Sequence, residues 1–138
     1  MSPRNRLFRL FRRPVEEELT IDAPDLAVVA EAFDPAEADS AVLCRSHRWN
    51  PARAAVLRHH LSLPAEGIDT AARILAQDGY QLRMAPDQRE SGEVTRVHAV
   101  RVQVLDALGC AQERARMAGL AQRLGGDALG WDALQPPA

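Results

Sequence analysis

The sequence predicts an α+β protein in which two helices cover one face of a four-stranded antiparallel sheet. Short apolar runs with strand character are interleaved with two longer stretches in which apolar residues recur at every third or fourth position. The second of these stretches ends in a glycine-rich turn, residues 125–130, and a tryptophan follows directly. Glycines at this density indicate a backbone that adopts positive φ or passes very close to another element. The turn therefore ends the predicted helix and directs Trp131, an expected core anchor, back onto the sheet.

Length and composition indicate a single domain with a core of small side chains. The chain has 138 residues, of which 46% are hydrophobic but only 4% aromatic, so Ala, Val and Leu must fill most of the core. Its basic residues are all arginines, which together with the abundant alanine is typical of a GC-rich bacterial genome. No apolar run reaches the roughly 18 residues of a membrane span, and no apolar core of a secretion signal follows the basic N-terminus. We therefore expect a cytoplasmic protein.

The two cysteines, Cys44 and Cys110, are too far apart in the sequence for a metal-binding knuckle or a redox pair. We expect both to be reduced and buried as small apolar residues. Cys110 lies in the first turn of a predicted helix, where an exposed thiol has a lowered pKa and is nucleophilic. Because it lies on the apolar side of that helix, we expect a core residue and not a nucleophile.

Charge is distributed unevenly, although the net charge is only −2. Residues 1–13 hold five arginines and no acid, and residues 16–39 hold nine acids and no base. Residues 40–138 hold twelve arginines and ten acids, a balance of +2, which argues against nucleic-acid binding through the folded part. Residues 1–13 form either a flexible arm or a short basic amphipathic helix, which would contact anionic lipid, RNA or an acidic protein surface.

Residues 14–39 are interpreted as an acidic linker. Asp25 is suited to cap a short helix, because the apolar residues after it recur at helical spacing up to Phe33. Asp34-Pro35 would end that helix. A flexible chain is the alternative for the whole segment.

Residues 41–48 and 54–63 both alternate like short strands, and the sequence Trp-Asn-Pro at 49–51 is typical of a turn. We therefore expect a β-hairpin here. The second run places His59 and His60 on opposite faces, because successive side chains of a strand alternate.

We expect helices over residues 68–77 and 108–124, in which apolar side chains recur at three- and four-residue spacing. Gly79 caps the first helix and Gly125-Gly126 caps the second, because the left-handed residue that ends a helix is usually glycine. The charged side chains of the second helix are expected to face water; they are Glu113, Arg114, Arg116 and Arg123.

Two further strands are expected over residues 80–84 and 94–105, joined by a polar hairpin loop at 86–92. In the longer strand, Val97 has the opposite parity to the valines that follow it. We therefore expect a bulge or an entry bend near Ala99.

The order of these elements determines the expected topology. Without residues 41–48 the order is β-α-β-β-α, which is the ferredoxin-like split βαβ arrangement lacking its last strand. That last strand lies antiparallel beside the first, and either residues 41–48 or a short stub at 131–134 would fill its place. The predicted fold is thus a ferredoxin-like α/β sandwich.

The histidines are the only candidate metal or acid–base set in the sequence. At most one of His59 and His60 shares a face with His98 on a neighbouring strand, whereas a zinc site needs three or four ligands. Neither a phosphate-binding glycine loop nor a nucleophile elbow is present, and the 125–130 turn follows a helix where a phosphate loop would open one. The sequence therefore predicts no metal, no cofactor and no enzyme activity.

Three features occur in the same order as in a known family. They are a strand that ends with Leu61 and Pro64, a helix that ends in Gly79-Tyr80, and a helix followed by Gly125-Gly126 and then Gly130-Trp131. Over residues 54–134 this pattern resembles the ribonuclease E inhibitor domain of the B-type regulators of ribonuclease E activity. The closing turn of that family usually has Tyr-Asp where this chain has Ala128-Leu129. The resemblance implies a non-catalytic, ferredoxin-like domain that binds a protein partner, which in that family is a ribonuclease.

The sequence thus predicts a regulatory module at 40–135, preceded by the arm and linker at 1–39 and followed by a tail at 136–138. Two alternatives stay open: a small-ligand or enzyme site on the sheet face near His59 and His98, and a membrane-surface adaptor through the N-terminal arginines. The expected turn and anchor residues are Gly79, Tyr80, Gly125, Gly126, Gly130 and Trp131. The candidate partner-contact residues are Arg4, Arg6, Arg9, Arg12, Arg13, His59 and His98.

Overall fold

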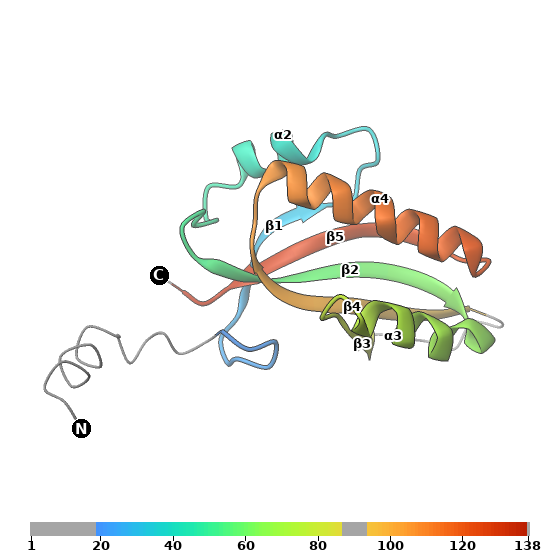
Figure 1. The fold of residues 1–138 in the computed structure, drawn as a ribbon. Helices are drawn as coiled ribbons and strands as arrows, with labels where there is room; N and C mark the ends of the chain where they lie inside the picture. Colours follow the sequence, from blue (N-terminus) through green and yellow to red (C-terminus); the bar gives the residue numbers. More distant parts are fainter. Residues whose placement is uncertain (1–18, 87–93, 138) are drawn as a thin grey trace, which may run out of the picture.

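The computed structural model describes residues 19–86 and 94–137, and this part of the chain has the predicted α+β architecture (Figure 1). Its sheet contains five strands instead of four, all neighbours being antiparallel, in the order β1-β5-β2-β4-β3. The strands are β1 (Ala27–Ala32), β2 (Ala54–Pro64), β3 (Gln81–Met84), β4 (Val94–Val104) and β5 (Asp127–Gln135). The described helices are α2 (Asp39–Arg45), α3 (Ile68–Ala76) and α4 (Ala107–Arg123), with a 3-10 turn, η1 (Ala65–Gly67), before α3.

Strand β5 is a full strand and not the short stub expected at 131–134. It pairs with β2 on one side and with β1 on the other, so it lies inside the sheet. The sequence pattern does not predict this full strand, because Gly130 and two alanines interrupt the alternation of apolar and polar side chains. Its buried positions become clear only when strands on both sides cover it.

Strand β1 replaces the short helix that the sequence predicts after Asp25. Asp25 has φ 62°, whereas a residue that caps the start of a helix needs an extended backbone. Ala30 and Ala32 are buried while Glu31 between them is exposed, which is the alternation of an edge strand. The segment expected to be a linker therefore contributes a strand to the sheet.

Helix α2 replaces the first strand of the predicted hairpin at 41–48. Val42 and Leu43 are buried, whereas Cys44 is exposed, contrary to expectation. An apolar run this short fits one side of a two-turn helix as well as a strand, and periodicity alone does not distinguish them. Ser46 ends the helix, and its hydroxyl donates to the carbonyl oxygen of Val42 at 2.6 Å.

The helices α3 and α4 and the strands β2, β3 and β4 are confirmed within one or two residues of the predicted bounds. Both predicted glycine caps are present. Gly79 and Gly125 each have φ 81°. The N–H of Gly126 donates to the carbonyl oxygen of Ala121 at 2.8 Å, and the N–H of Tyr80 donates to that of Leu75 at 3.1 Å, the bonds of Schellman caps.

Strand β4 pairs with β2 residue for residue along its whole length, so the bulge expected near Ala99 is absent. Val97 and Val100 point to opposite faces of the sheet, yet both are buried. Val97 packs in a cluster with α3 and α4, and Val100 packs in a cluster with residues 19–26. An unbroken strand can therefore bury both valines. The predicted loop at 86–92 lies outside the described residues except for Pro86.

The three described helices pack on one side of the sheet, here called the helical face. One buried cluster joins α2 and the start of α4 to β1, β2 and β5, and a second joins α3 and the rest of α4 to β2 and β4. The other side is called the open face; residues 19–26 cover part of it through Leu19, Ile21 and Leu26, which pack on Val56, Val100 and Leu134. No helix within residues 19–86 and 94–137 is long and apolar enough to cross a membrane.

Gly130 is a point of close approach between β5 and the end of β1. It has φ 140°, and a Cβ added there would lie 2.3 Å from the carbonyl oxygen of Ala32 and 2.6 Å from Cδ1 of Phe33. We expect Gly130→Ala to lower the free energy of unfolding by at least about 2 kcal/mol, because backbone strain and a main-chain clash act together. Gly119→Ala is the matched control: the space beside Gly119 in α4 is open, so that variant should gain about 1 kcal/mol from helix propensity. Urea denaturation measures both, and equal stability of G130A and wild type would contradict the geometry.

Trp131 is fully buried and belongs to the cluster between α2, α4 and β5. We expect Trp131→Ala to lower the free energy of unfolding by about 3–5 kcal/mol, as large-to-small core substitutions do. Leu108→Ala is the control, because Leu108 is 69% exposed and its truncation should change stability by about 0.5 kcal/mol or less. A loss below about 1 kcal/mol for W131A in the same denaturation experiment would mean that the ring is not part of the core.

Candidate functional site

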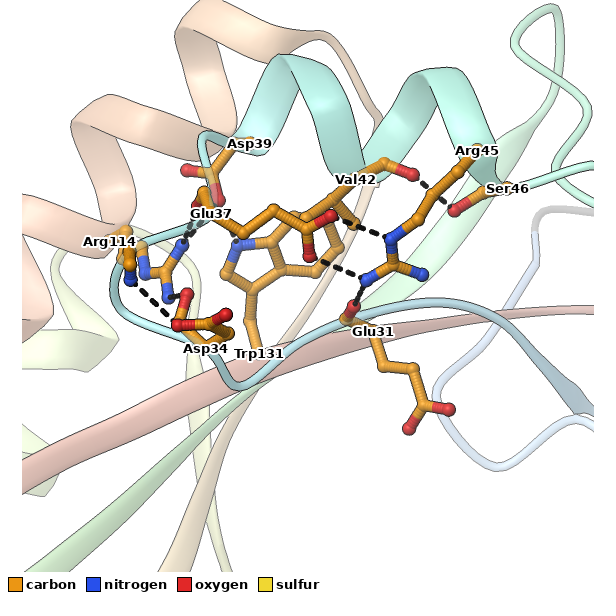
Figure 2. Close-up of polar contacts among 10 residues, drawn as sticks. Glu31, Asp34, Glu37, Asp39, Val42, Arg45, Ser46, Arg114 and Trp131 are labelled. Carbon is orange, nitrogen blue, oxygen red and sulfur yellow. Dashed lines mark hydrogen bonds and ion pairs between the residues drawn. The ribbon is translucent and has the colours of Figure 1, made fainter.

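A polar network on the helical face surrounds Trp131, the residue expected to anchor the core (Figure 2). The indole Nε1 of Trp131 donates to Oδ1 of Asp39 at 3.1 Å, and Nη1 of Arg114 donates to the same oxygen at 2.7 Å. Arg114 also donates to the carbonyl oxygens of Asp34 at 3.1 Å and Glu37 at 3.4 Å. One carboxylate and one guanidinium thus join β5, α4, α2 and the loop before α2.

A second ion pair continues this network toward the surface. Nε and Nη2 of Arg45 donate to the two carboxylate oxygens of Glu37 at 2.8 and 2.7 Å, and Nη2 also donates to the carbonyl oxygen of Glu31 at 3.0 Å (Figure 2). Half of the Arg45 side chain is exposed, so this pair adds little stability. The groups of both ion pairs are engaged within the protein, which gives the network a structural role.

Tyr80 organises the other end of the helical face. Its buried hydroxyl donates to Glu113, and the guanidinium of Arg101 lies over its ring at 4.2 Å from the centroid. Burial, together with this hydrogen bond, raises the pKa of Tyr80. Glu113 and Arg114 are therefore bonded and partly buried, and the expectation that both face water as solvated charges is wrong.

Cys110 is fully buried in the first turns of α4. Burial, with smaller contributions from Asp39 and Asp106, raises the pKa of its thiol to about 12. Asp106 also caps the helix, since its side chain accepts the N–H of Gly109 at 2.6 Å. The thiol stays protonated at neutral pH, so Cys110 is a core residue as expected.

The open face carries a row of charged and imidazole groups across three neighbouring strands. Arg58 on β2 donates through Nε and Nη2 to both oxygens of Asp132 on β5, at 2.8 and 2.6 Å. Nε2 of His60 lies 3.2 Å from Oδ1 of Asp132. The ring of His60 lies beside that of His98 on β4, with 4.2 Å between the centroids. These four residues are called the open-face row.

The register separates His59 from His98. His60 is the residue directly opposite His98, and His59 points to the helical face. A shared site of His59 and His98 is therefore wrong, because it assigns the wrong member of the adjacent histidine pair to this face. Within residues 19–86 and 94–137, no three His, Cys, Asp or Glu side chains gather closely enough to hold a metal ion.

The protonation states follow from burial and from the neighbouring charges. Burial opposes ionisation of Asp132, but the hydrogen bonds from Arg58 and the close contact with His60 outweigh it and lower the pKa of Asp132 to about 2. Burial, with smaller contributions from the neighbouring His60 and Arg58, lowers the pKa of His98 to about 4. Burial is also the largest cause that lowers the pKa of His59, to about 3. At neutral pH, Asp132 is charged and both of these histidines are neutral.

The contacts of the open-face row engage its charged groups with one another. The Asp132 carboxylate is bonded by Arg58, and among residues 19–86 and 94–137 the recorded partners of the row include neither serine, threonine nor cysteine. A nucleophilic mechanism needs a nucleophile within hydrogen-bond reach of its base. The row instead presents a fixed pattern of donors and acceptors beside apolar side chains.

Sequence reasoning found the turn residues but missed most of the polar partners. The pairing of Asp132 with Arg58 depends on which strands are neighbours, and so does the contact of Asp39 with Trp131. The only local signal is that Asp132 directly follows a buried tryptophan in a strand, so it must point the other way. The five arginines Arg4, Arg6, Arg9, Arg12 and Arg13 lie outside the described residues.

Comparison with protein-family models, with curated protein sequences and with solved structures found no match for this chain. The resemblance to the regulators of ribonuclease E activity rests, therefore, on the strand, helix-end and turn residues quoted above. In the structure these residues are mostly caps and buried side chains, with Gly79 and Gly125 at helix ends and Tyr80 and Trp131 in the core.

Acid should destabilise the protein through its buried histidines. The folded pKa values of His98 and His59 lie below the ordinary 6.5, so the unfolded chain binds more protons as the pH falls from 6.5 toward 4. The free energy of unfolding should therefore decrease over this range. His98→Gln removes one of the two groups. Between pH 4.5 and 6.5, the free energy of unfolding of this variant should therefore change clearly less with pH than that of the wild type. Urea denaturation at each pH measures this free energy, and equal slopes for the variant and the wild type would mean that His98 does not contribute.

Proposed function

We propose that this protein is a non-catalytic regulatory module that binds a protein partner through the open face of its sheet. The observation that carries the proposal is the difference between the two faces. The described helices all pack on the helical face, whereas the open face carries the Arg58–Asp132–His60–His98 row. Within the described part of the chain, residues 19–26 cover part of this face.

The remainder of the open face has the composition of a protein interface. Along β4 the side chains with the parity of His98 include exposed Arg96 and the valines 94 and 104, which are 40% and 57% exposed. Val28 of β1, on the same face, is 39% exposed. Apolar side chains interspersed with arginine are typical of interfaces between separately folded proteins. The positive charge at Arg96 favours a partner surface that carries acidic side chains.

We also propose that the elements from β2 to β5 form a ferredoxin-like unit. Their order along the chain is β-α-β-β-α-β, and their order in the sheet is β5-β2-β4-β3. Strand β1 and helix α2 are then additions at the β5 edge. Such additions explain why five strands are present where the ferredoxin-like pattern has four.

The proposed partner class is a ribonuclease, and the proposed compartment is the cytoplasm. Support for a ribonuclease comes from the resemblance carried by Gly125, Gly126, Gly130 and Trp131 and by the Gly79-Tyr80 helix end. Because Tyr80 and Trp131 are buried, they support a common fold, and contact with a ribonuclease would come from other residues. The open face is the surface that we propose for this contact.

Binding to purified ribonuclease E, measured by titration calorimetry, tests the proposal. We expect Arg96→Glu to weaken the affinity at least about tenfold, a change of about 1.4 kcal/mol. Arg123→Glu makes the same charge change on an exposed residue at the end of α4, on the helical side, and should leave the affinity unchanged. Equal loss in both variants would show a general charge effect and would exclude the open face. Absence of binding by the wild-type chain would exclude ribonuclease E as the partner.

A further inference from the structure

A cavity of about 430 Å³ lies on the helical face, between α4, the start of β5 and the loop before α2. Its walls are mainly apolar, and they include His59, Met117, Ala118, Ala128 and Leu129. This volume is within the range of pockets that hold small molecules, roughly 300–1,000 Å³. The cavity is on the opposite side of the sheet from the open-face row, so it is independent of the proposed protein-binding surface.

His59 gives this cavity a polar group that the fold itself does not use. The residue is 1% exposed, and within the described chain its Nε2 has no hydrogen-bond partner. A buried polar atom without a partner destabilises the folded state, whereas an apolar side chain of similar size would not. Its neighbours along β2 on the same face are Leu57 and Leu61, both fully buried. His59 therefore combines a place in the lining of the cavity with a buried ring nitrogen that has no partner within the described residues.

The charges around the cavity determine which ligands fit it. Arg114 lines the cavity, but its guanidinium is paired with Asp39 and bonded to two carbonyl oxygens. His59 is neutral at physiological pH because burial lowers its pKa to about 3. Asp127 is the other charged residue of the lining, but it is exposed, so its carboxylate keeps its hydration. A charged ligand beside His59 would lose its own hydration and gain no free opposite charge from His59 or Arg114. A neutral molecule with an apolar body and a single hydroxyl group fits, because a hydroxyl can donate to or accept from either tautomer of the imidazole.

We propose that this cavity binds a small neutral alcohol or phenol, whose hydroxyl group forms a hydrogen bond with Nε2 of His59 and whose apolar part packs on Met117, Ala128 and Leu129. The thioether of Met117 is a favourable neighbour for an aromatic ring. Gly130 and Pro35 also line the cavity. The ligand would be held between α4 and β5, the two elements that Trp131 and Arg114 already join.

Phenol and benzene are a matched pair of probes for this proposal, since they differ by the hydroxyl group alone. We expect phenol to shift the imidazole nitrogen resonances of His59 and the methyl resonances of Met117 and Ala128 saturably in an NMR titration of the full chain. Benzene should bind at least about tenfold more weakly, because it leaves His59 unpaired. Equal affinities for the two probes would overturn the role of His59. Absence of saturable shifts with phenol would overturn the site.

Two variants locate the binding. Ala118 is exposed and lines the cavity, so Ala118→Leu should fill the space and weaken phenol binding at least about tenfold. Ala115→Leu makes the same change one turn earlier on α4, at an exposed position that does not line the cavity, and should bind phenol as the wild type does. Unchanged binding in A118L would place phenol elsewhere and overturn the proposal. His59→Phe should lower phenol affinity to that of benzene, and the A118L comparison decides the matter if H59F does not fold.

Discussion

The shared hydrogen bonding of Asp39 is the interaction on which most of the helical face depends. Asp39 is only 6% exposed, and a buried carboxylate is tolerated only when charge and hydrogen bonds compensate for lost hydration. Arg114 supplies the charge, and the indole N–H of Trp131 supplies a further hydrogen bond. Because these three residues come from α2, α4 and β5, their mutual position determines how the two helices lie on the sheet (Figure 2). The loop before α2 is held by the same arginine through two carbonyl oxygens.

Strand β5 divides the structural and the proposed binding roles between its two faces. Trp131 points to the helical face and takes part in the core, whereas Asp132 points to the open face and holds Arg58. Because neighbouring residues of a strand point to opposite sides, Trp131 contributes to the helical face and Asp132 to the open face. A change at the Trp131–Asp39–Arg114 contact is therefore expected to alter the open face only through the position of β5, and this makes separate tests of the two faces feasible.

The sequence was sufficient for elements whose signal is local. Helices α3 and α4 follow from apolar periodicity, and their ends follow from Gly79 and Gly125, which adopt left-handed backbone conformations. Strand β1 and helix α2 have six and seven residues, too few for periodicity to separate helix from strand. Their true state depends on burial against β5 and α4, which the local pattern does not contain.

The candidate sites were less predictable than the fold because they depend on register. The alternation rule places His59 and His60 on opposite faces, but only the pairing of β2 with β4 shows that His60 meets His98. The partners Trp131 and Asp39 are 92 positions apart in the sequence, and Arg58 and Asp132 are 74 apart. Contacts at such separations follow from the order of strands in the sheet, and the sequence predicted that order incompletely.

A double-mutant cycle between Asp39 and Arg114 is the most direct test of whether the buried Asp39 carboxylate depends on the Arg114 guanidinium. Asp39→Asn keeps an acceptor for Trp131 but removes the charge, and Arg114→Gln removes the guanidinium; urea denaturation of both single variants and the double variant gives the coupling free energy. We expect a coupling free energy of about 1.5–3 kcal/mol, as for charge-assisted hydrogen bonds. The double variant should then be hardly less stable than either single variant. Additive losses, with a coupling within about 0.5 kcal/mol of zero, would contradict it.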